Sequence, residues 1–445
     1  MKPVPPPSRR SHPGPYRQRY TLATDSNGKP SGARLSPPVG FPLQRGDVVS
    51  ALASALGETR SGHRLGRQLA DMLGVRWGCP ISSGRAALAL LLEVLHRLEP
   101  ARDEVVLAAY TCYSVPSAVA RAGLRVRLVD LAPRSFDIDS SRLAGVVGPQ
   151  TLAIVATHLL GYPLDLRPLR AAALASGATL IDDAAQALGA RYEGRAVGGG
   201  GKAGVLSFGR GKPIGALGGG AILCDDPQLM AAVERAVAAL PRTPLQTSAA
   251  TALVAAVYTP LLRPEIYWVP AQLPFLKLGV TEYDPDFPMQ RLDGFRIGLI
   301  LRGLARLEEV NETRRRVAER LTRALGPISG VEMVPPPPNG ETIYLRFPIL
   351  LPSAELRDQA LKALRIAGIG ASRLYPEPLT AIPALILLSP DVEQRFPEAK
   401  RLAERLLCLP TYPHVSDPVV SQVAETLTAV LARSGDRLAS RAASA

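Results

Sequence analysis

The sequence predicts an α/β protein in which a large domain with a mostly parallel central sheet precedes a smaller C-terminal α/β domain. The length of 445 residues is typical of a two-domain enzyme. Apolar residues make up 47% of the chain, which is enough for a sizeable core. Short apolar runs alternate with helical stretches over the first half of the chain, and this alternation implies a sheet covered by helices on both faces.

The elements follow one another in a regular order. Helical periodicity extends over residues 47–57 and 63–73, with Asp47 as the expected N-cap of the first helix. An apolar helix is expected over Ala86–Leu98. The runs that we predict as strands are Glu104–Ala108, Arg125–Val129, Leu152–Thr157, Thr179–Ile181, Gly204–Phe208 and Ala221–Cys224. Ligands of such sheets bind at the carboxyl ends of the strands.

Composition and periodicity divide the chain into four parts. Residues 1–40 form a disordered Pro- and Arg-rich arm, 41–290 the large domain, 291–433 a long charged helix with the small domain, and 434–445 a frayed tail. The charged helix is expected over 300–325. Within the small domain we predict strands near Glu341–Leu350 and Gly368–Leu374 and a last helix near Val419–Arg433.

The net charge of +13 raises the question of a nucleic-acid partner. Residues 1–45 hold eight Lys or Arg, ten Pro and a single acid, Asp25, so the arm supplies most of the excess and is too polar to fold. No basic stripe with interleaved aromatic residues is present, which argues against nucleic-acid binding. The four cysteines form no Cys-x-x-Cys pair and the five histidines are scattered, so the sequence predicts a cytoplasmic protein without a metal site or disulfides.

Residues 241–288 interrupt the strand–helix rhythm as an apolar insertion. Pro244–Leu262 carries no charge, but Pro, Gln, Ser and Thr make it a poor membrane span. It is expected to pack against a partner subunit. The alternative is peripheral contact with a membrane surface.

One candidate site lies where the Thr179–Ile181 strand ends in Asp182 and Asp183, followed by Gln186. A strand-end carboxylate can pair with a cationic group in a ligand. Taken alone, capping of a following helix is the simpler explanation of the same residue.

A second candidate is the turn from Ser207 to Lys212, which is followed by glycines. A lysine in a crowded, partly desolvated turn can act as a nucleophile, whereas most single lysines are exposed. A phosphate-binding P-loop is excluded because Pro213 follows the lysine. Ser83, Gly84 and Arg85 open an apolar helix, whose free backbone N–H groups can bind phosphate.

Together these motifs resemble the DegT/DnrJ/EryC1/StrS family of sugar aminotransferases, which depend on pyridoxal 5′-phosphate (PLP) and have fold type I. The resemblance rests on Ser-Gly before a helix, Asp-Asp-x-x-Gln-Ala and Ser-Phe-x-x-x-Lys, in that order. Thr157–Pro163, Arg291–Arg306 and Leu409–Pro413 are similar to a His-x-x-Gly-x-Pro segment, the interface helix and the C-terminal strand-turn of the family. The similarity spans about residues 41–433.

The resemblance implies roles for the matching residues. Lys212 would hold PLP as a Schiff base and shuttle the proton, and Asp183 would pair with the pyridine nitrogen. Gln186 would lie beside the ring. The other implied cofactor contacts are Ser207, Gly84, Arg85 and His158, of which His158 is equally well explained as a structural residue.

Three departures from the family pattern bear on the substrate. Arg85 stands where the family usually has Thr. Cys112 stands where an aromatic residue commonly stacks on the ring, so either Cys112 or the next residue, Tyr113, is expected to cover it. Met289 replaces an Asn that often reaches the partner's phosphate.

The resemblance implies a homodimeric aminotransferase that moves an amino group, from L-glutamate, to a keto group of a nucleotide-linked sugar. Two alternatives stay open. One is a dehydratase or aromatising enzyme of the same family, and the other is a non-catalytic regulator or scaffold that keeps the fold.

Overall fold

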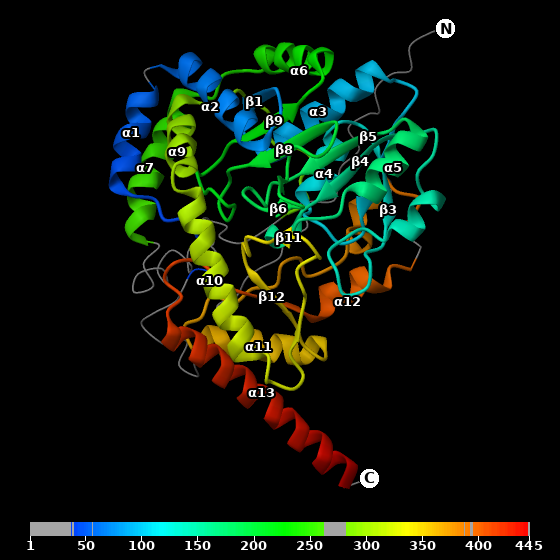
Figure 1. Cartoon of the computed structure of the whole chain (residues 1–445), viewed down its shortest axis with the longest axis vertical. Coiled ribbons are helices and arrows are strands. Elements are labelled where there is room, and N and C mark those ends of the chain that lie inside the picture. Colours follow the sequence, from blue (N-terminus) through cyan, green and yellow to red (C-terminus); the bar gives the residue numbers. More distant parts are fainter. Residues whose placement is uncertain are drawn as a thin grey trace.

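The structure is a computed structural model, and it describes residues 37, 40–55, 57–261, 282–386, 388–391 and 395–443 (Figure 1). The predicted arm lies outside this part of the chain apart from Pro37 and Gly40. Phe41, at which the sequence predicts the large domain to begin, is buried at 3% exposure.

The large domain is built on a seven-stranded sheet with the order β1-β9-β8-β5-β4-β2-β3. Neighbours from β8 to β3 are parallel, whereas β9 runs antiparallel to both β8 and β1. The strands are β1 (Trp77–Ile81), β2 (Glu104–Ala108), β3 (Arg125–Val129), β4 (Thr151–Thr157), β5 (Thr179–Asp183), β8 (Ala203–Ser207) and β9 (Gly220–Cys224). The predicted fold class, a mostly parallel α/β sheet, is confirmed.

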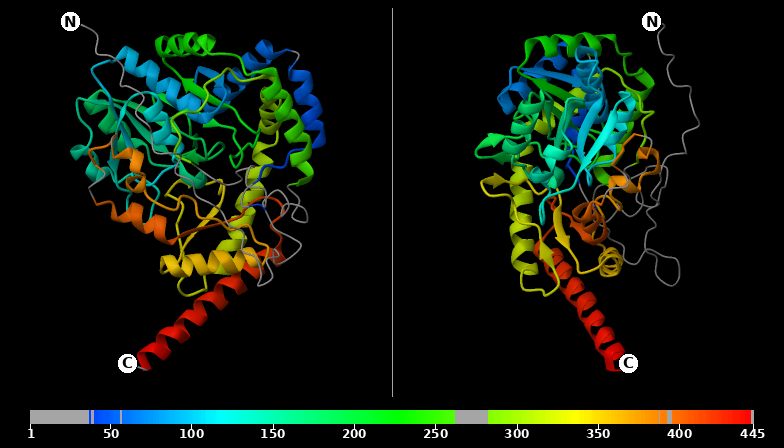
Figure 2. Two further views of the ribbon diagram at one scale, coloured as in Figure 1. Left: turned by 180° about the vertical axis from the view of Figure 1, so that it is seen from behind. Right: turned by 90° about the vertical axis from the view of Figure 1, so that its right-hand side faces the viewer.

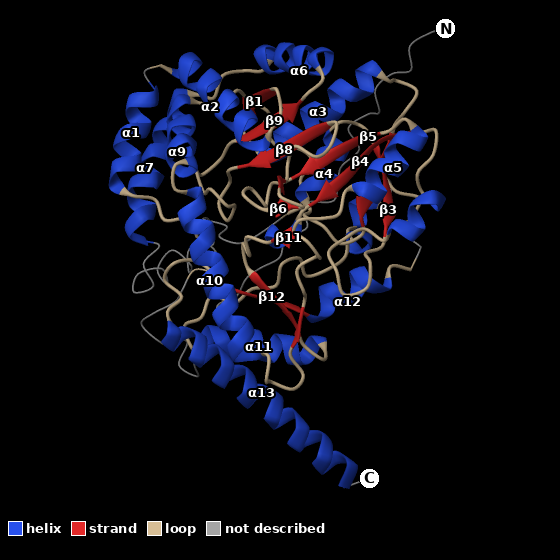
Figure 3. Cartoon of the chain, in the orientation of Figure 1, coloured by secondary structure: helices blue, strands red, loops and turns tan. Residues whose placement is uncertain are grey.

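Helices cover both faces of this sheet (Figure 3). Alternation along β9 shows the two faces, since Ile222 joins one apolar cluster while Ala221 and Leu223 join the other. The first cluster is shared with α3, α4 and α6 and the second with α1, α2 and α9. The helices are α1 (Arg45–Ala55), α2 (Glu58–Leu73), α3 (Gly84–Leu98), α4 (Ser114–Arg121), α5 (Arg167–Ser176), α6 (Pro227–Ala239), α7 (Leu245–Leu261) and α9 (Gly294–Leu304).

The smaller domain packs helices on a three-stranded antiparallel sheet with the order β10-β12-β13. Its elements are α10 (Leu307–Leu325), β10 (Glu332–Met333), β12 (Phe347–Leu350), α11 (Ala354–Ile366), α12 (Pro397–Arg405), β13 (Leu406–Leu409) and α13 (Asp417–Ala443). A further small sheet joins β11 (Gly340–Glu341) to the β6 (Arg191–Tyr192) and β7 (Arg195–Ala196) hairpin of the large domain.

Several predicted boundaries in the small domain are wrong. The expected strand over Glu341–Leu350 is split into β11 and β12, which belong to different sheets. No strand forms over Gly368–Leu374, where only Ser372 bridges to Cys408. Helix α13 continues to Ala443, past the predicted start of the tail at residue 434, and both views in Figure 2 show it leading away from the body.

The long helix expected over 300–325 is two helices, α9 and α10, that meet at Ala305 and Arg306. The break is stabilised from the N-terminal side. Arg306 donates to the Pro42 carbonyl at 2.9 Å and pairs with buried Asp47. Asp47 is therefore not the N-cap that the sequence suggests, because α1 already begins at Arg45.

Residues 262–281 of the apolar insertion lie outside the described residues, whereas its earlier part forms helix α7. Helix α7 lies beside α1 at one edge of the molecule (Figure 1). Leu245 is 84% exposed and Leu253 67% exposed, so much of its apolar surface is uncovered in the single chain. Among the described helices, none is long and apolar enough to cross a membrane.

Candidate active site

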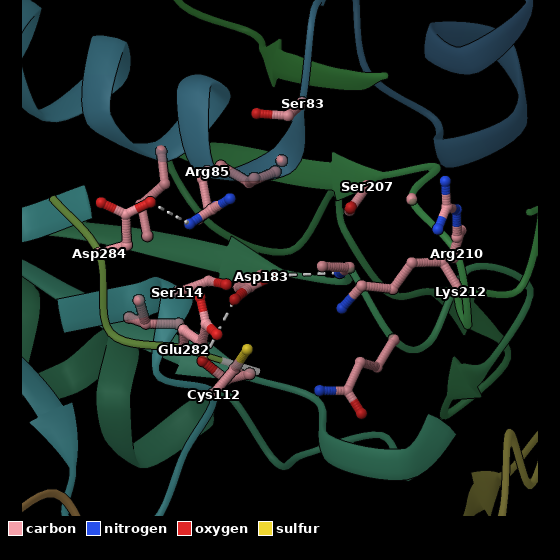
Figure 4. Close-up of a pocket in the computed structure, with 18 residues that line it drawn as sticks. Ser83, Arg85, Cys112, Ser114, Asp183, Ser207, Arg210, Lys212, Glu282 and Asp284 are labelled. Atoms are coloured by element: carbon pink, nitrogen blue, oxygen red, sulfur yellow. Dashed lines mark hydrogen bonds and ion pairs between the residues drawn. The ribbon is translucent and has the colours of Figure 1, made fainter. Parts of the chain in front are cut away.

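A cavity of about 420 Å³ opens at the carboxyl ends of β4, β5 and β8. The strand ends supply Thr157, Asp183 and Ser207 to its wall, as the rule for parallel sheets predicts. Figure 4 shows the arrangement. The other lining residues are Ser83, Gly84, Arg85, Leu88, Cys112, Ser114, Val115, Ala185, Gln186, Val205, Gly209, Arg210, Lys212, Glu282 and Asp284.

Asp183 is a nearly buried carboxylate, 4% exposed, that faces this cavity. Burial raises its pKa, whereas a hydrogen bond from the Ala185 N–H at 3.0 Å and the nearby Lys212 and His158 oppose the rise. The Thr157 hydroxyl adds a longer contact of 3.3 Å. Few donors therefore compensate the carboxylate, which leaves it suited to hold a cationic ring nitrogen.

Lys212 extends across the cavity toward Asp183 (Figure 4) and is half-buried, so the simple alternative of an exposed loop lysine does not hold. Backbone hydrogen bonds hold the turn that carries Lys212. The Phe208 N–H donates to the Gly219 carbonyl at 2.8 Å, and the Ala216 N–H donates to the Phe208 carbonyl at 2.9 Å. Gly211 has a φ of +74°, which favours glycine beside the lysine.

The start of α3 borders the opposite wall. The Ser83 hydroxyl caps the helix by accepting from the Ala86 N–H at 3.1 Å. A Cβ atom at Gly84 would lie 2.6 Å from the Ser207 Cβ, so only glycine fits there. The helix N-terminus, Gly84 and Ser207 thus form a small polar cradle of the kind that holds a phosphate.

Arg85 also lines the cavity, but other groups already engage its guanidinium. It lies 3.9 Å from an Asp284 carboxylate oxygen and 5.0 Å from the centre of the Phe287 ring. The Asp284 N–H in turn donates to the Ser117 hydroxyl oxygen at 3.0 Å. Arg85 therefore joins the start of α3 to the last part of the 241–288 insertion.

Cys112 and Tyr113, the two residues predicted to cover a cofactor ring, differ in where their side chains lie. Cys112 lines the cavity, whereas Tyr113 does not. The Tyr113 ring packs 5.5 Å from that of Tyr375, and its hydroxyl donates to the Glu377 carbonyl at 2.9 Å. The Tyr113 side chain packs in the core, so the cavity geometry favours Cys112 for this role.

His158 is fully buried and does not line the cavity. Its Nδ1 accepts from the Leu164 N–H at 2.8 Å, so its Nε2 carries the proton that is donated to Asp182 at 2.6 Å. The other Asp182 oxygen accepts two backbone N–H groups. His158 thus lies behind the cavity wall, a position that favours the structural one of the two readings that the sequence left open.

Gln186 lies on the cavity wall with a fixed amide. Its nitrogen donates to the Tyr375 hydroxyl at 2.8 Å, and its oxygen accepts from the Leu160 N–H at 3.2 Å. The sequence did not indicate Tyr375, a buried residue that lies far along the chain and holds the Gln186 amide in place. It also missed the lining residues Thr157, Ser114, Arg210, Glu282 and Asp284, of which only Thr157 carried a signal, as the last residue of a predicted strand.

Gly84 offers a direct test of the phosphate cradle. In Gly84→Ala the new methyl group would push into Ser207, and we expect PLP affinity to fall about tenfold or more while the fold survives. Fluorescence titration of the cofactor-free protein with PLP measures this. Gly148→Ala is the matched control, because nothing lies within 4 Å of its Cβ position. Equal PLP affinity for both variants would contradict a cradle at this place.

Comparisons with known proteins agree with this geometry. The model of the DegT/DnrJ/EryC1/StrS aminotransferase family matches residues 48–240 and 289–428, so the predicted insertion falls between the two matched segments. The chain is 30% identical over 328 residues to the pleiotropic regulatory protein of Geobacillus stearothermophilus, covering 73% of this chain and 78% of the relative. It is 26% identical over 399 residues to a UDP-N-acetyl-3-dehydro-α-D-glucosamine 3-aminotransferase of Acidithiobacillus ferrooxidans, covering 88% and 95%.

Among solved structures, an aminotransferase of Streptoalloteichus hindustanus superimposes with a TM-score of 0.72 at 25% identity, covering 90% of this chain and 99% of that one. The sequence family, the fold and the cavity therefore point to the same class of enzyme. The prediction that the protein is an aminotransferase is confirmed. The chain belongs to the DegT/DnrJ/EryC1/StrS aminotransferase family.

Proposed function

We propose that this chain binds PLP in the cavity at Lys212 and transfers an amino group from an amino acid, L-glutamate first, to a keto group of a nucleotide-linked sugar. The observation that carries the proposal is the placement of Lys212 opposite the buried Asp183 in one cavity. PLP supplies, when bound, an electron sink for negative charge on the amino-bearing carbon.

The residues fit this cofactor in three places. The cradle of Gly84, Ser207 and the α3 N-terminus suits the phosphate. Asp183, whose pKa burial raises, gains most when a protonated pyridine nitrogen lies beside it. Lys212 has the reach to form the covalent link and then, once released, to move a proton as general base and acid.

The walls of the cavity set the remaining geometry. Cys112 would contact the ring face, and Gln186, held by Tyr375, would contact its edge. Arg85, Arg210, Glu282 and Asp284 give the cavity charged groups of both signs, which suits a substrate rich in hydroxyl and phosphate groups. The sugar-nucleotide class itself is supported by the name of the Acidithiobacillus relative.

A regulatory role is the competing proposal, because the Geobacillus relative is named a regulatory protein. A scaffold would have no need for a lysine, a buried carboxylate and a glycine cradle that converge on one cavity. A PLP-dependent dehydratase would keep these same groups. Its reaction products, rather than its site residues, would therefore distinguish it from an aminotransferase.

The deciding experiment separates the two half-reactions. The PLP-loaded protein is mixed with L-glutamate without an acceptor, and 2-oxoglutarate is expected in an amount equal to the enzyme. Adding keto-sugar nucleotides should then give continuous turnover with one or more of them. If PLP binds but no amino donor yields its oxo acid, transamination is refuted and the dehydratase reading is favoured. If no PLP binds, the regulatory reading is favoured.

We further propose a cytoplasmic homodimer. The uncovered apolar residues of α1 and α7, including Val49, Leu52, Leu253 and Val257, support a partner subunit on that edge. Peripheral membrane contact through the same insertion is the alternative. Light scattering should give twice the chain mass without detergent, whereas a monomer that floats with liposomes would favour the membrane.

A further inference from the structure

Helix α10 lies next to the turn that carries Lys212. Arg314 is the most buried basic residue of this helix. Arg314 is 1% exposed, and burial lowers the pKa of its guanidinium to about 9. Within the described ranges no carboxylate forms an ion pair with it. A buried guanidinium without a counter-charge is costly, so its contacts need an explanation.

Those contacts reach the lysine turn directly. One terminal nitrogen of Arg314 donates to the Pro213 carbonyl at 3.2 Å and to the Gly40 carbonyl at 3.5 Å. Pro213 is the residue after Lys212 and cannot donate a backbone hydrogen bond of its own. The guanidinium therefore holds the chain one peptide away from the lysine.

The same side chain is tied to the segment that carries Asp183. The other terminal nitrogen of Arg314 donates to the Asn311 side-chain oxygen at 2.7 Å. The Asn311 amide then donates to the Leu188 carbonyl at 3.2 Å. Leu188 lies on the segment that follows Asp183 and includes Gln186, and all three residues are buried.

A glycine makes room for this second tie. A Cβ atom at Gly189 would lie 2.3 Å from the Asn311 amide nitrogen, and Gly189 has a φ of +96°. Asn311 is itself fully buried. The pair thus forms one continuous bridge, from the Leu188 carbonyl through Asn311 and Arg314 to the Pro213 carbonyl.

We infer that Arg314 and Asn311 are positioning residues that fix Lys212 relative to Asp183. The inference rests on the proposed function for its catalytic meaning, although the bridge itself does not depend on a cofactor. A planar guanidinium suits the task because it donates in two fixed directions at once, which a lysine ammonium does not. Packing of Ile214 against Gly303 holds the far side of the turn, so losing the bridge should loosen the turn without unfolding the domain.

The test compares Arg314→Gln with Arg316→Gln, a control on the same helix where the side chain is exposed. In the cofactor-free protein, limiting acetic anhydride labels lysines, and peptide mass spectrometry gives the labelling of Lys212 relative to exposed Lys202. We expect the Lys212 ratio to rise about threefold or more in Arg314→Gln, because a loosened turn exposes the amine more often. The control should leave the ratio unchanged.

A second readout uses the PLP-loaded enzyme. Arg314→Gln should lower kcat about tenfold or more with little change in substrate KM, as expected when a catalytic group is misplaced. Arg314→Lys should not rescue it. An unchanged or lower Lys212 ratio in a folded variant overturns the inference, and it does so even if wild type takes up no PLP, which would refute only the proposed function.

Asn311→Ala keeps the test decisive if Arg314→Gln fails to fold. It removes the tie to Leu188 without removing the cation, and we expect the same direction of change in the Lys212 ratio. A folded Asn311→Ala protein with a wild-type ratio would overturn the bridge.

Discussion

Lys212→Ala should abolish transamination, with a fall in kcat of about a thousandfold or more. The side chain is the amine that faces Asp183 across the cavity, and an alanine there can neither link to PLP nor move a proton. Borohydride reduction of the PLP-loaded wild type, followed by peptide mass spectrometry, should place the cofactor on Lys212. The variant should retain PLP only non-covalently, through the phosphate cradle.

Lys202→Ala is the matched control for this variant. Lys202 lies one residue before β8, is exposed, and does not line the cavity. Its replacement should leave both activity and covalent labelling at the wild-type level. Covalent PLP on another lysine in the Lys212→Ala protein, together with residual turnover, would overturn the assignment.

The parts of the fold that depend on local pattern could be predicted from the sequence. Glu104–Ala108 and Arg125–Val129 are strands with the predicted bounds. The first is apolar after Glu104 and buried throughout, whereas the second has arginines at its first and third positions and lies at the edge of the sheet. Strand β1 was missed because Gly78 and Pro80 interrupt its pattern, which an edge position tolerates. The break between α9 and α10 depends on Arg306 and Asp47, a long-range pair that periodicity cannot reveal.

The site, too, divides into residues that a local pattern predicts and residues that depend on long-range packing. Asp183, Ser207 and Lys212 meet at strand ends, and the topology of a parallel sheet makes that meeting predictable. Which of Cys112 and Tyr113 faces the cavity depends on how Tyr375 packs, 5.5 Å from the Tyr113 ring and far along the chain. Likewise, Glu282 and Asp284 enter from a segment that has no periodicity, so no local signal marked them.

Asp183→Asn should lower the activity of the enzyme while it raises the stability of the cofactor-free fold. Without the carboxylate, the ring nitrogen loses the charge that keeps it protonated, and we expect kcat to fall about a hundredfold or more. The cofactor-free variant should nevertheless be more stable than wild type at neutral pH. Its amide can still accept from the Ala185 N–H, and it carries no charge to desolvate.

The sign of the pH dependence follows from the raised pKa of Asp183. A carboxyl whose folded-state pKa is raised binds its proton more tightly in the folded than in the unfolded state. Its contribution to stability is therefore complete below the unfolded pKa of about 4 and is lost as pH rises through the folded pKa. Thermal melts of the cofactor-free proteins should diverge over that interval, with Asp183→Asn higher by about 1 °C for each 1 kcal/mol in a chain of this length.

The neighbouring carboxylate should give the opposite result, which makes Asp182→Asn the control. Asp182 is fully buried, and its oxygens accept from His158 and from the Gly198 and Gly200 N–H groups at 2.6, 2.8 and 2.7 Å. An amide must point its own N–H groups at one of these donors, which costs about 1–3 kcal/mol and lowers the melting temperature. If instead Asp182→Asn were the stable, inactive variant and Asp183→Asn the unstable one, the roles of the two carboxylates would be exchanged and the proposed cofactor geometry would fail.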